Sequence, residues 1–364
     1  MEQMRDAIEA LRASTSIHTL RLVRDQWQTS WSQTMNSSEV LDWNEQLNRW
    51  HDALMAQTVR QCEELLVQEG WGSPPARYAF VLFGSGGRSE QAQWSDQDHG
   101  MILEDAADRT VFEYFAHLSD VIVEHLRMLG FPRCKGQVLT SNALWRKTMK
   151  QWEEQLSLWL GELTWEHVRY LLIASDMRPV YGDFDLASEW RSLYTQLVRN
   201  TDGIAEAMLR NTLYYKVSMN SFGQIIRERF GEFAGGLNLK YGAYIPLVNG
   251  IRYLAMTTGL KGDEDTLHAL QTPNTWQRLL YLKQSGFKDT ELLGSCEQAF
   301  RSVLARRAMI PFVLENNEYV SHGYLDESDL TRDVVRSLKK ELQVVQHLQR
   351  YLNRQIRTQM RNER

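Results

Sequence analysis

Residues 78–103 read Tyr78-Ala-Phe-Val-Leu-Phe-Gly-Ser-Gly-Gly-Arg-Ser-Glu-Gln-Ala-Gln-Trp-Ser-Asp-Gln-Asp-His-Gly-Met-Ile-Leu103. An apolar run at 78–83 ends in a glycine-rich turn at 84–87, and a second apolar run follows Asp98. The first run is typical of a buried strand, and the glycines are typical of a turn that opens a helix. We therefore expect a strand, a tight turn and a second strand at the centre of a small sheet.

Two features of this region favour phosphate chemistry. Residues i and i+2 of a strand point to the same face, so Asp96 and Asp98 can hold one divalent cation between them. Glycine has no Cβ, so the backbone N–H groups of the turn can approach phosphate oxygens closely. A phosphate cradle beside paired carboxylates is typical of metal-dependent phosphoryl or nucleotidyl transfer.

Gly84-Ser85 followed by Asp96-x-Asp98 resembles the signature of the DNA polymerase β-type nucleotidyltransferase superfamily. The fuller string, Gly-Ser-Gly-Gly-Arg-Ser-Glu-Gln and Ser-Asp-Gln-Asp, is similar to one branch of it. Members of that branch are often fused to CBS or cyclic-nucleotide-binding domains and are related to the uridylyltransferase of the PII signalling protein. The resemblance spans essentially the whole chain.

The resemblance implies a uridylyltransferase- or adenylyltransferase-like enzyme with a role in signal transduction. It would transfer NMP from an NTP, such as ATP, to a hydroxyl of a protein or small-molecule acceptor and release pyrophosphate. The implied cofactor is Mg²⁺ or Mn²⁺, with Asp96 and Asp98 as its ligands. Gly84, Ser85 and Gly86 would hold the phosphates.

The roles of two further residues follow from the same resemblance. Arg88 either reaches a phosphate or pairs with Glu90 or with a neighbouring domain. The superfamily site also needs a third carboxylate, and Asp176, at the end of the apolar run that begins at Leu171, is the best-placed candidate. It would complete the metal site and help to draw the proton from the acceptor hydroxyl. The reserve candidates are Asp183 and Asp185, and the role of Arg178 stays open.

Residues 235–255 resemble the substrate-binding domain of the same branch, in which a Leu-x-Leu-Lys-like motif opens a helix that faces the catalytic cleft. Here that motif ends at Lys240, which together with Arg252 could neutralise a triphosphate. Family members often carry Asp where this chain has Asn238, so a role for a carboxylate at this position is in doubt.

Length and hydrophobic patterning predict a mostly helical α+β protein. With 364 residues, 43% of them hydrophobic, the chain can bury a large core in two or three domains. We expect an N-terminal helical segment at 1–75, a nucleotidyltransferase-like domain with a small mixed sheet at 76–185, and a C-terminal helical bundle at 186–364. Gly70-Trp-Gly-Ser-Pro-Pro75 marks the first boundary.

Several elements can be placed from their periodicity. Arg109–Leu129 predicts an amphipathic helix, and Glu327–Met360 predicts a long terminal one. Gln137–Asn142 fits either a short strand or an extended loop. Trp145, Trp152 and Trp159 recur every seven residues, which places their rings along one face of a helix, where core packing is expected.

Bulk properties exclude several classes of protein. A net charge of −5 and a pI near 6.0 argue against a general nucleic-acid binder, although they leave room for a small RNA partner. The three cysteines are far apart, so we expect reduced thiols rather than a zinc site or a disulfide framework. We expect no signal peptide, no membrane span and a cytoplasmic location.

Other interpretations of the glycine turn agree less well with the sequence. A P-loop requires a Lys after its glycines, and none follows here. A catalytically silent sensor with the same fold is the main alternative, because metal-bound nucleotide sensing would need the same residues. A helical interaction scaffold would explain the flanking helices but not residues 84–98.

Overall fold

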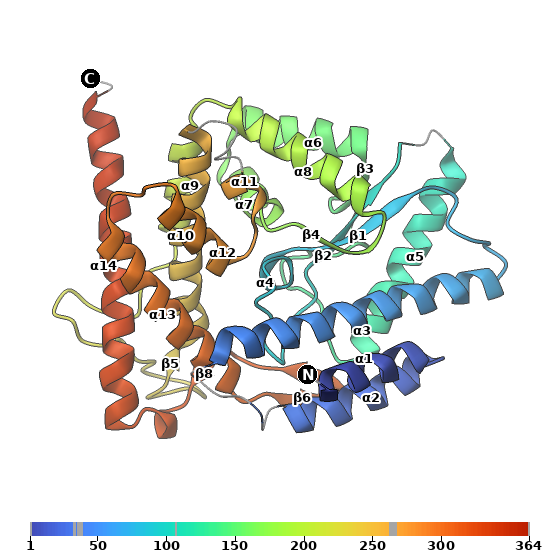
Figure 1. Cartoon of the computed structure of the whole chain (residues 1–364), viewed down its shortest axis with the longest axis horizontal. Helices are drawn as coiled ribbons and strands as arrows, with labels where there is room; N and C mark the ends of the chain where they lie inside the picture. The colour runs from blue at the N-terminus through green and yellow to red at the C-terminus, as the bar shows by residue number, and fades with distance from the viewer. Residues whose placement is uncertain (1, 32–33, 35–38, 106–107, 262–267, 363–364) are drawn as a thin grey trace. The chain divides into compact units, whose positions relative to one another are not determined.

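A computed structural model of the chain describes residues 2–31, 34, 39–105, 108–261 and 268–362 (Figure 1). The chain folds into two compact units. The N-terminal unit comprises Met1–Leu158, Ile173–Tyr194 and Phe312–Ser321; the C-terminal unit comprises Trp159–Leu172, Thr195–Pro311 and His322–Arg364. The expected class is confirmed, because the protein is mostly helical with a small mixed sheet. The boundaries expected at residues 75 and 185 stay predictions.

The sheet of the N-terminal unit holds, among the described residues, four strands in the order β3-β2-β1-β4. The strands are β1 (Tyr78–Leu82), β2 (His99–Leu103), β3 (Arg146–Thr148) and β4 (Arg178–Gly182). β1 pairs antiparallel with both β2 and β4, whereas β3 pairs parallel with β2. Every residue of β1 and β2 is buried, as their apolar runs predict.

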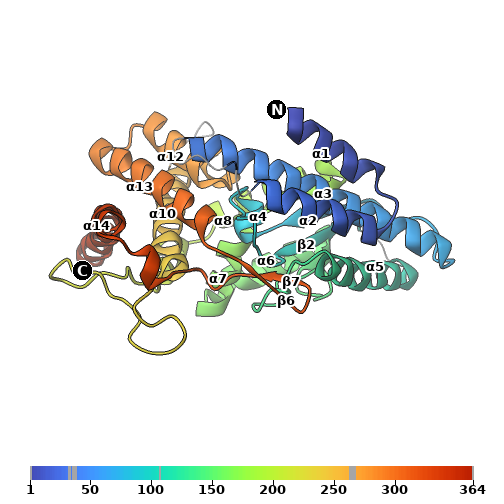
Figure 2. The ribbon, with the colours of Figure 1, turned by 90° about the horizontal axis from the view of Figure 1, so that it is seen from below.

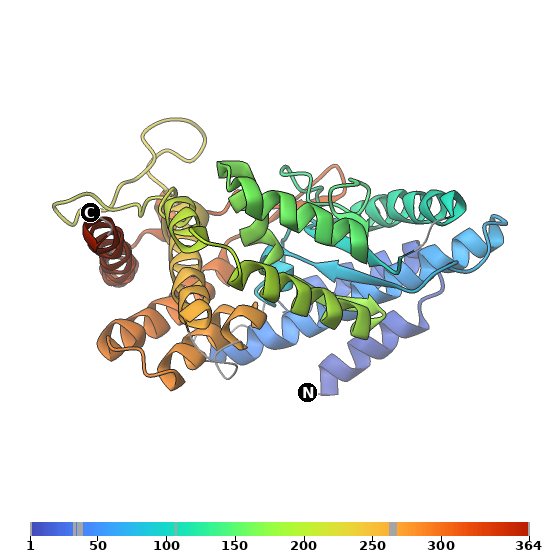
Figure 3. The same cartoon turned by 90° about the horizontal axis from the view of Figure 1, so that it is seen from above.

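Helices cover both faces of this sheet. The N-terminal unit contains α1 (Glu2–Ala13), α2 (Ile17–Trp31), α3 (Val40–Gln68) and α5 (Arg109–Met128), and α6 (Met149–Glu162) and α8 (Phe184–Arg199) begin in it. Figure 3 shows α6 and α8 over one face, and Figure 2 shows α2 and α3 over the opposite one. On the first face the Trp152 indole donates a hydrogen bond to the Met101 carbonyl of β2.

The tryptophans pack in the core, as expected, but one of them belongs to a different element. Trp145, Trp152 and Trp159 are all buried. Only the last two lie on α6, whereas Trp145 lies in a turn before β3. The prediction of three rings on one helix was therefore wrong, because pairing with β2 draws residues 146–148 into the sheet. Of the two alternatives for Gln137–Asn142, the loop is the one found.

The C-terminal unit is a helical bundle with a short two-stranded ladder. Its elements are α9 (Ile204–Thr212), β5 (Leu237–Asn238), a π-helix (Lys240–Tyr244), α10 (Ile245–Lys261), α11 (His268–Gln271), α12 (Thr275–Gln284), α13 (Thr290–Met309), β8 (Tyr324–Leu325) and α14 (Arg332–Asn362). The periodicity of the terminal helix predicts a buried apolar stripe from Val335 to Ile356, and the residues from Leu338 to Leu352 of that stripe are buried. Val335 is only half-buried, and the side chain of Ile356 lies outside the described residues. The helix starts at Arg332 rather than Glu327, because Glu327–Asp329 form a separate 3₁₀ turn.

Two elements connect the units along the chain. Helix α7 (Trp165–Ala174) begins in the C-terminal unit and ends in the N-terminal one. A hairpin of β6 (Val313–Glu315) and β7 (Glu318–Val320) returns to the N-terminal unit late in the sequence. Its turn residues, Asn316 and Asn317, both have positive φ, which a two-residue hairpin turn of this hand requires.

Two expectations about the chain as a whole can be compared with the structure. Cys62, Cys134 and Cys296 are buried free thiols, as expected. Among the described helices, none combines the length and the apolar composition needed to cross a bilayer.

Candidate active site

The glycine turn is a single helical turn, α4 (Gly84–Gly87), that follows β1 directly. Gly84 has a φ of +53°, and a Cβ on it would lie 2.6 Å from Oδ2 of Asp98. A Cβ on Gly87 would lie 1.8 Å from the carbonyl oxygen of Asp176. Two of the expected acidic residues therefore lie directly against this turn. A side chain at residue 87 would meet fixed backbone, whereas one at residue 84 would meet the movable Asp98 carboxylate.

Asp96 and Asp98 share one face of the chain where it enters β2. Both side chains are partly exposed, whereas the alternating residues Gln97 and His99 are buried. This is the i, i+2 arrangement that the sequence predicted. The turn and the pair are also tied by their backbones, since the Phe83 N–H donates to the Asp98 carbonyl at 2.8 Å.

A buried polar network fixes the opposite face of this segment. The Thr140 N–H donates to Nδ1 of His99, so the other ring nitrogen, Nε2, carries the proton and donates to Oε1 of Gln97 at 2.9 Å. The Gln97 amide in turn donates to the carbonyls of Val123 and Phe131. Burial lowers the pKa of His99 to about 3, so this ring is neutral at physiological pH and acts as a fixed hydrogen-bond partner.

Cys134 also lies at this site, which no motif in the sequence indicates. Cys134 lies on the loop that follows α5, and its thiol donates a hydrogen bond to the carboxylate of Asp98. Burial raises the pKa of the thiol, and the negative charges of Asp98 and Asp96 raise it further. The side chain is therefore a neutral donor that holds one orientation of the Asp98 carboxylate.

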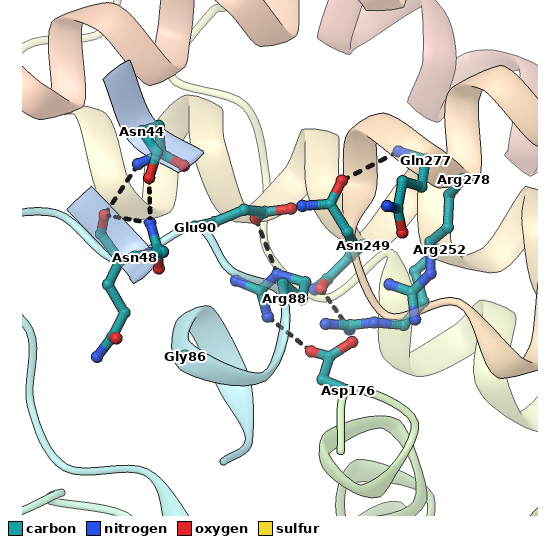
Figure 4. A network of polar contacts seen from close by, with 12 residues as sticks. Asn44, Asn48, Gly86, Arg88, Glu90, Asp176, Asn249, Arg252, Gln277 and Arg278 are labelled. Atoms are coloured by element: carbon teal, nitrogen blue, oxygen red, sulfur yellow. Dashed lines mark hydrogen bonds and ion pairs between the residues drawn. The ribbon is translucent and has the colours of Figure 1, made fainter. Parts of the chain in front are cut away.

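Asp176 lies in the turn between α7 and β4, and it is buried beside Arg88. Figure 4 shows the Arg88 guanidinium between two carboxylates: it contacts Oδ2 of Asp176 at 2.6 Å and Oε2 of Glu90 at 2.9 Å. Of the alternatives for Arg88, the structure therefore contains the pair with Glu90. A phosphate-binding role for Arg88 stays a prediction.

Arg178, at the start of β4, braces the glycine turn. Its guanidinium makes two hydrogen bonds to the carboxylate of Asp52 on α3, at 2.7 and 2.8 Å, and donates a third to the Gly86 carbonyl. Bidentate pairs of this kind are geometrically specific. Asp52 could not be identified from sequence, because an acidic residue on an amphipathic helix is ordinarily solvated.

The two reserve carboxylates lie at the other end of the sheet. Gly182, at the end of β4, pairs with Ala79 near the start of β1, whereas the glycine turn follows the end of β1. Asp183 accepts a hydrogen bond from the Leu186 N–H and pairs with Arg77, and Asp185 is exposed in the first turn of α8. Neither therefore belongs to the cluster around Asp98.

In the C-terminal unit, Lys240 begins the π-helix that leads into α10, so the expected helix start is confirmed. Asn238 accepts a hydrogen bond from the Tyr241 N–H at 2.8 Å. This is a helix-capping contact that an Asp at the same position would also make. Arg252 is buried and donates to Asn249 within α10 (Figure 4). A phosphate contact by Lys240 or Arg252 stays a prediction.

The donor atoms at the turn fit a hard divalent cation. Mg²⁺ is commonly bound through one or two carboxylates together with the phosphates of a substrate, and Asp96 and Asp98 offer two carboxylates on one partly exposed face. Among the described residues, no three His, Cys, Asp or Glu side chains are arranged to hold a metal ion. The participation of Asp176 in a metal site therefore stays a prediction.

A mixed sheet with a glycine turn and paired carboxylates at one strand end defines a nucleotidyltransferase-like protein. Two family models match the chain: "Putative nucleotidyltransferase DUF294" over residues 26–166, and "Putative nucleotidyltransferase substrate binding domain" over residues 203–356. The chain belongs to this nucleotidyltransferase family, and the expected resemblance is confirmed. Asp96 and Asp98 lie within the first match, whereas Asp176 lies outside both. A search of curated proteins finds no match.

Proposed function

We propose that the protein is a Mg²⁺-dependent enzyme that transfers NMP from an NTP to an acceptor hydroxyl. The contact between Asp98 and the glycine turn carries this proposal. It places a carboxylate that could bind a metal directly beside the backbone that would hold the phosphates. Mn²⁺ would serve in the same place, and the acceptor would be a protein, as in a uridylyltransferase- or adenylyltransferase-like enzyme, or a small molecule.

The chemistry is an in-line displacement at the α-phosphorus. The acceptor oxygen forms a bond to the α-phosphorus, the bond to the bridging oxygen breaks, and pyrophosphate leaves. The metal, when bound, supplies charge neutralisation for the attacking and leaving oxygens. Gly84 and Ser85, both partly exposed, would position the triphosphate, and much of the rate would come from this positioning.

Individual side chains would prepare the site for this step. The Gln97–His99 network and the Cys134 thiol would hold Asp96 and Asp98 in place from behind. Asp176 would receive the proton of the acceptor hydroxyl, while its Oδ2 is paired with Arg88.

The alternative is a catalytically silent nucleotide sensor with the same fold. One observation favours it: the Asp176 carboxylate contacts the Arg88 guanidinium in a buried ion pair, so one expected member of the catalytic group already has a cationic partner. A sensor would bind metal and nucleotide through Asp96 and Asp98 without turnover.

The test is release of pyrophosphate from each of the four labelled NTPs with Mg²⁺ or Mn²⁺, with cell extract as a source of acceptor. We expect Asp96→Asn/Asp98→Asn to lose at least about 100-fold in rate, as expected when electrostatic stabilisation of the transition state is removed. Asp185→Asn is the matched control, because it makes the same change on an exposed helix turn.

Equal rates in wild type and the double variant, with every NTP, would contradict the enzymatic function. Nucleotide binding that depends on metal and on Asp96 and Asp98, without turnover, would establish the sensor instead.

A further inference from the structure

Four aromatic rings form a continuous row on the surface of the C-terminal unit. Trp165 contacts Tyr214 at a centroid distance of 5.1 Å, Tyr214 contacts Tyr215 at 5.2 Å, and Tyr215 stacks on Tyr241 at 5.3 Å. These four residues, here called the aromatic row, come from α7, from the segment after α9 and from the π-helix.

The rings of the aromatic row are exposed, in contrast to the tryptophans that form the core of the N-terminal unit. The exposed fractions are 50% for Trp165, 63% for Tyr214, 37% for Tyr215 and 44% for Tyr241. Trp145, Trp152 and Trp190 are fully buried. Contiguous exposed apolar surface of this kind commonly marks a binding site.

Hydrogen bonds hold the backbone of the aromatic row in place. Asn211 donates to the Trp165 carbonyl at 3.1 Å, and Gln349 of α14 donates to the Tyr215 carbonyl at 2.7 Å. Tyr241 is fixed by its N–H bond to Asn238. The rings are therefore presented on an anchored backbone, which lowers the entropy cost of binding a ligand.

Cationic side chains lie near two rings of the aromatic row. The Lys240 ammonium lies 5.7 Å from the centre of the Tyr241 ring, and the charge of Arg169 acts on Tyr215; Arg169 also lies 3.6 Å from Glu166. Lys216 is exposed next to Tyr215. The described side chains of α14, which contacts the row through Gln349, include six Lys and Arg against two Asp and Glu.

We propose that the aromatic row binds a short stretch of single-stranded nucleic acid, with bases on the rings and phosphates on Lys240 and its cationic neighbours. Bases of any identity stack on aromatic side chains, and cations beside them follow the phosphate backbone. A free nucleotide has the same chemistry, but one base covers one ring and leaves the rest of the row uncovered. The row therefore fits several consecutive nucleotides better than one NTP.

If the strand presents its terminal hydroxyl as the acceptor, the inference deepens the proposed function and rests on it. Strand binding itself does not depend on catalysis. The net charge of the whole chain, −5, disfavours a long duplex, whereas a few nucleotides need only a local basic surface.

The test is fluorescence anisotropy of the full chain with a labelled 12-nucleotide single-stranded RNA at low salt. We expect Tyr214→Ala and Trp165→Ala each to weaken binding by roughly tenfold or more, because one stacked base is lost. Tyr214→Phe should retain affinity. Lys240→Gln should lower the slope of log affinity against log salt by about 0.7, the value for one phosphate contact with a single strand.

The control is Trp71→Ala, which removes an exposed tryptophan of the N-terminal unit and should leave RNA affinity unchanged. No RNA binding by wild type at low salt, or equal loss in Tyr214→Ala and Trp71→Ala, would overturn the proposal. Tighter binding to the RNA duplex, or displacement by ATP at equal concentration, would overturn the assignment to a single strand.

A second measurement separates this inference from the proposed function. Asp96→Asn/Asp98→Asn should bind the RNA as wild type does, because both residues lie in the N-terminal unit. Extension of the RNA by one nucleotide in wild type alone would support the acceptor role. RNA binding without extension, alongside pyrophosphate release with another acceptor, would leave strand binding supported and overturn the acceptor role.

Discussion

Gly84 is the residue at which backbone conformation and site chemistry coincide. A φ of +53° is unfavourable for residues with a side chain, and the nearest atom to an added Cβ is a carboxylate oxygen of Asp98. The carboxylate is the flexible end of a side chain, so it can move away from a methyl group. The consequence of adding that methyl group is therefore a displaced Asp98 rather than a disrupted core.

We predict that Gly84→Ala abolishes metal-dependent nucleotide binding while lowering the free energy of unfolding by only about 1–2 kcal/mol, the cost of a left-handed residue. Isothermal titration with NTP and Mg²⁺, together with urea unfolding, measures both effects. Gly161→Ala is the matched control: nothing lies within 4 Å of its added Cβ, and a helical alanine is stabilising by up to about 1 kcal/mol. Wild-type nucleotide affinity in Gly84→Ala would contradict the placement of the site.

At the entry to strand β2, side chains alternate between the partly exposed face of the candidate site and the buried core. Asp96 and Asp98 are partly exposed, whereas Gln97 and His99 are buried and hydrogen-bonded. The pH dependence of the free energy of unfolding reports on the buried side chain of His99. Burial lowers the pKa of His99 from 6.5 to about 3, so between these values the unfolded chain binds a proton that the folded chain does not. Stability is therefore retained above pH 6.5 and is lost as the pH falls towards 3.

We predict that His99→Gln becomes more stable relative to wild type by about 1.4 kcal/mol per pH unit as the pH falls from 6 to 4, because the variant lacks this titrating ring. Urea unfolding at several pH values measures the difference. His18→Gln, on an exposed position of α2, is the control and should show no such trend. A constant difference between His99→Gln and wild type across this range would show that His99 is not buried in its neutral form.

For individual helices and strands, the sequence predicted the structure correctly where the pattern depended on residues close together in the chain. The i, i+2 spacing of Asp96 and Asp98 predicted their common face, and the apolar stripe of α14 predicted its buried side. The seven-residue spacing of Trp145 and Trp152 was misleading, because parallel strand pairing at 146–148 outweighs helical periodicity. The contacts of Cys134 with Asp98 and of Asp52 with Arg178 could not be predicted, because they join segments far apart in the chain without a motif.

At the scale of the whole molecule, each of the two units is built from segments that are not contiguous in the sequence. The β6–β7 hairpin lies within the residues matched by the substrate-binding family model, yet it belongs to the N-terminal unit. The Tyr319 N–H donates to the Gly130 carbonyl at 2.9 Å, and its hydroxyl donates to Asp25 of α2. Hydrophobic periodicity reports which face of a strand is buried but not which partner covers it, so the sequence could not reveal this connection.

Tyr319 also covers two cationic side chains of α2, which makes its removal a test of the connection. The Arg24 guanidinium is buried and lies 4.7 Å from the centre of the Tyr319 ring, and that of Arg21 lies 5.0 Å from it. Burial lowers the pKa of Arg24 to about 9, so its charge depends on the contacts that remain around it. An arginine in this position is stabilised by the face of an aromatic ring.

We predict that Tyr319→Ala lowers the free energy of unfolding of the N-terminal unit by about 3 kcal/mol, as expected for removal of a largely buried aromatic side chain. Hydrogen exchange measures the effect: amides of β1 and β2 should lose protection, whereas those of α13 and α14 should keep it. Val313→Ala is the control on the same hairpin, because Val313 is half exposed and its truncation should change little. Loss of protection confined to α13 and α14 would place the hairpin in the C-terminal unit. Uniform loss in both units would instead mean that they unfold together, so that the hairpin stabilises one cooperative structure.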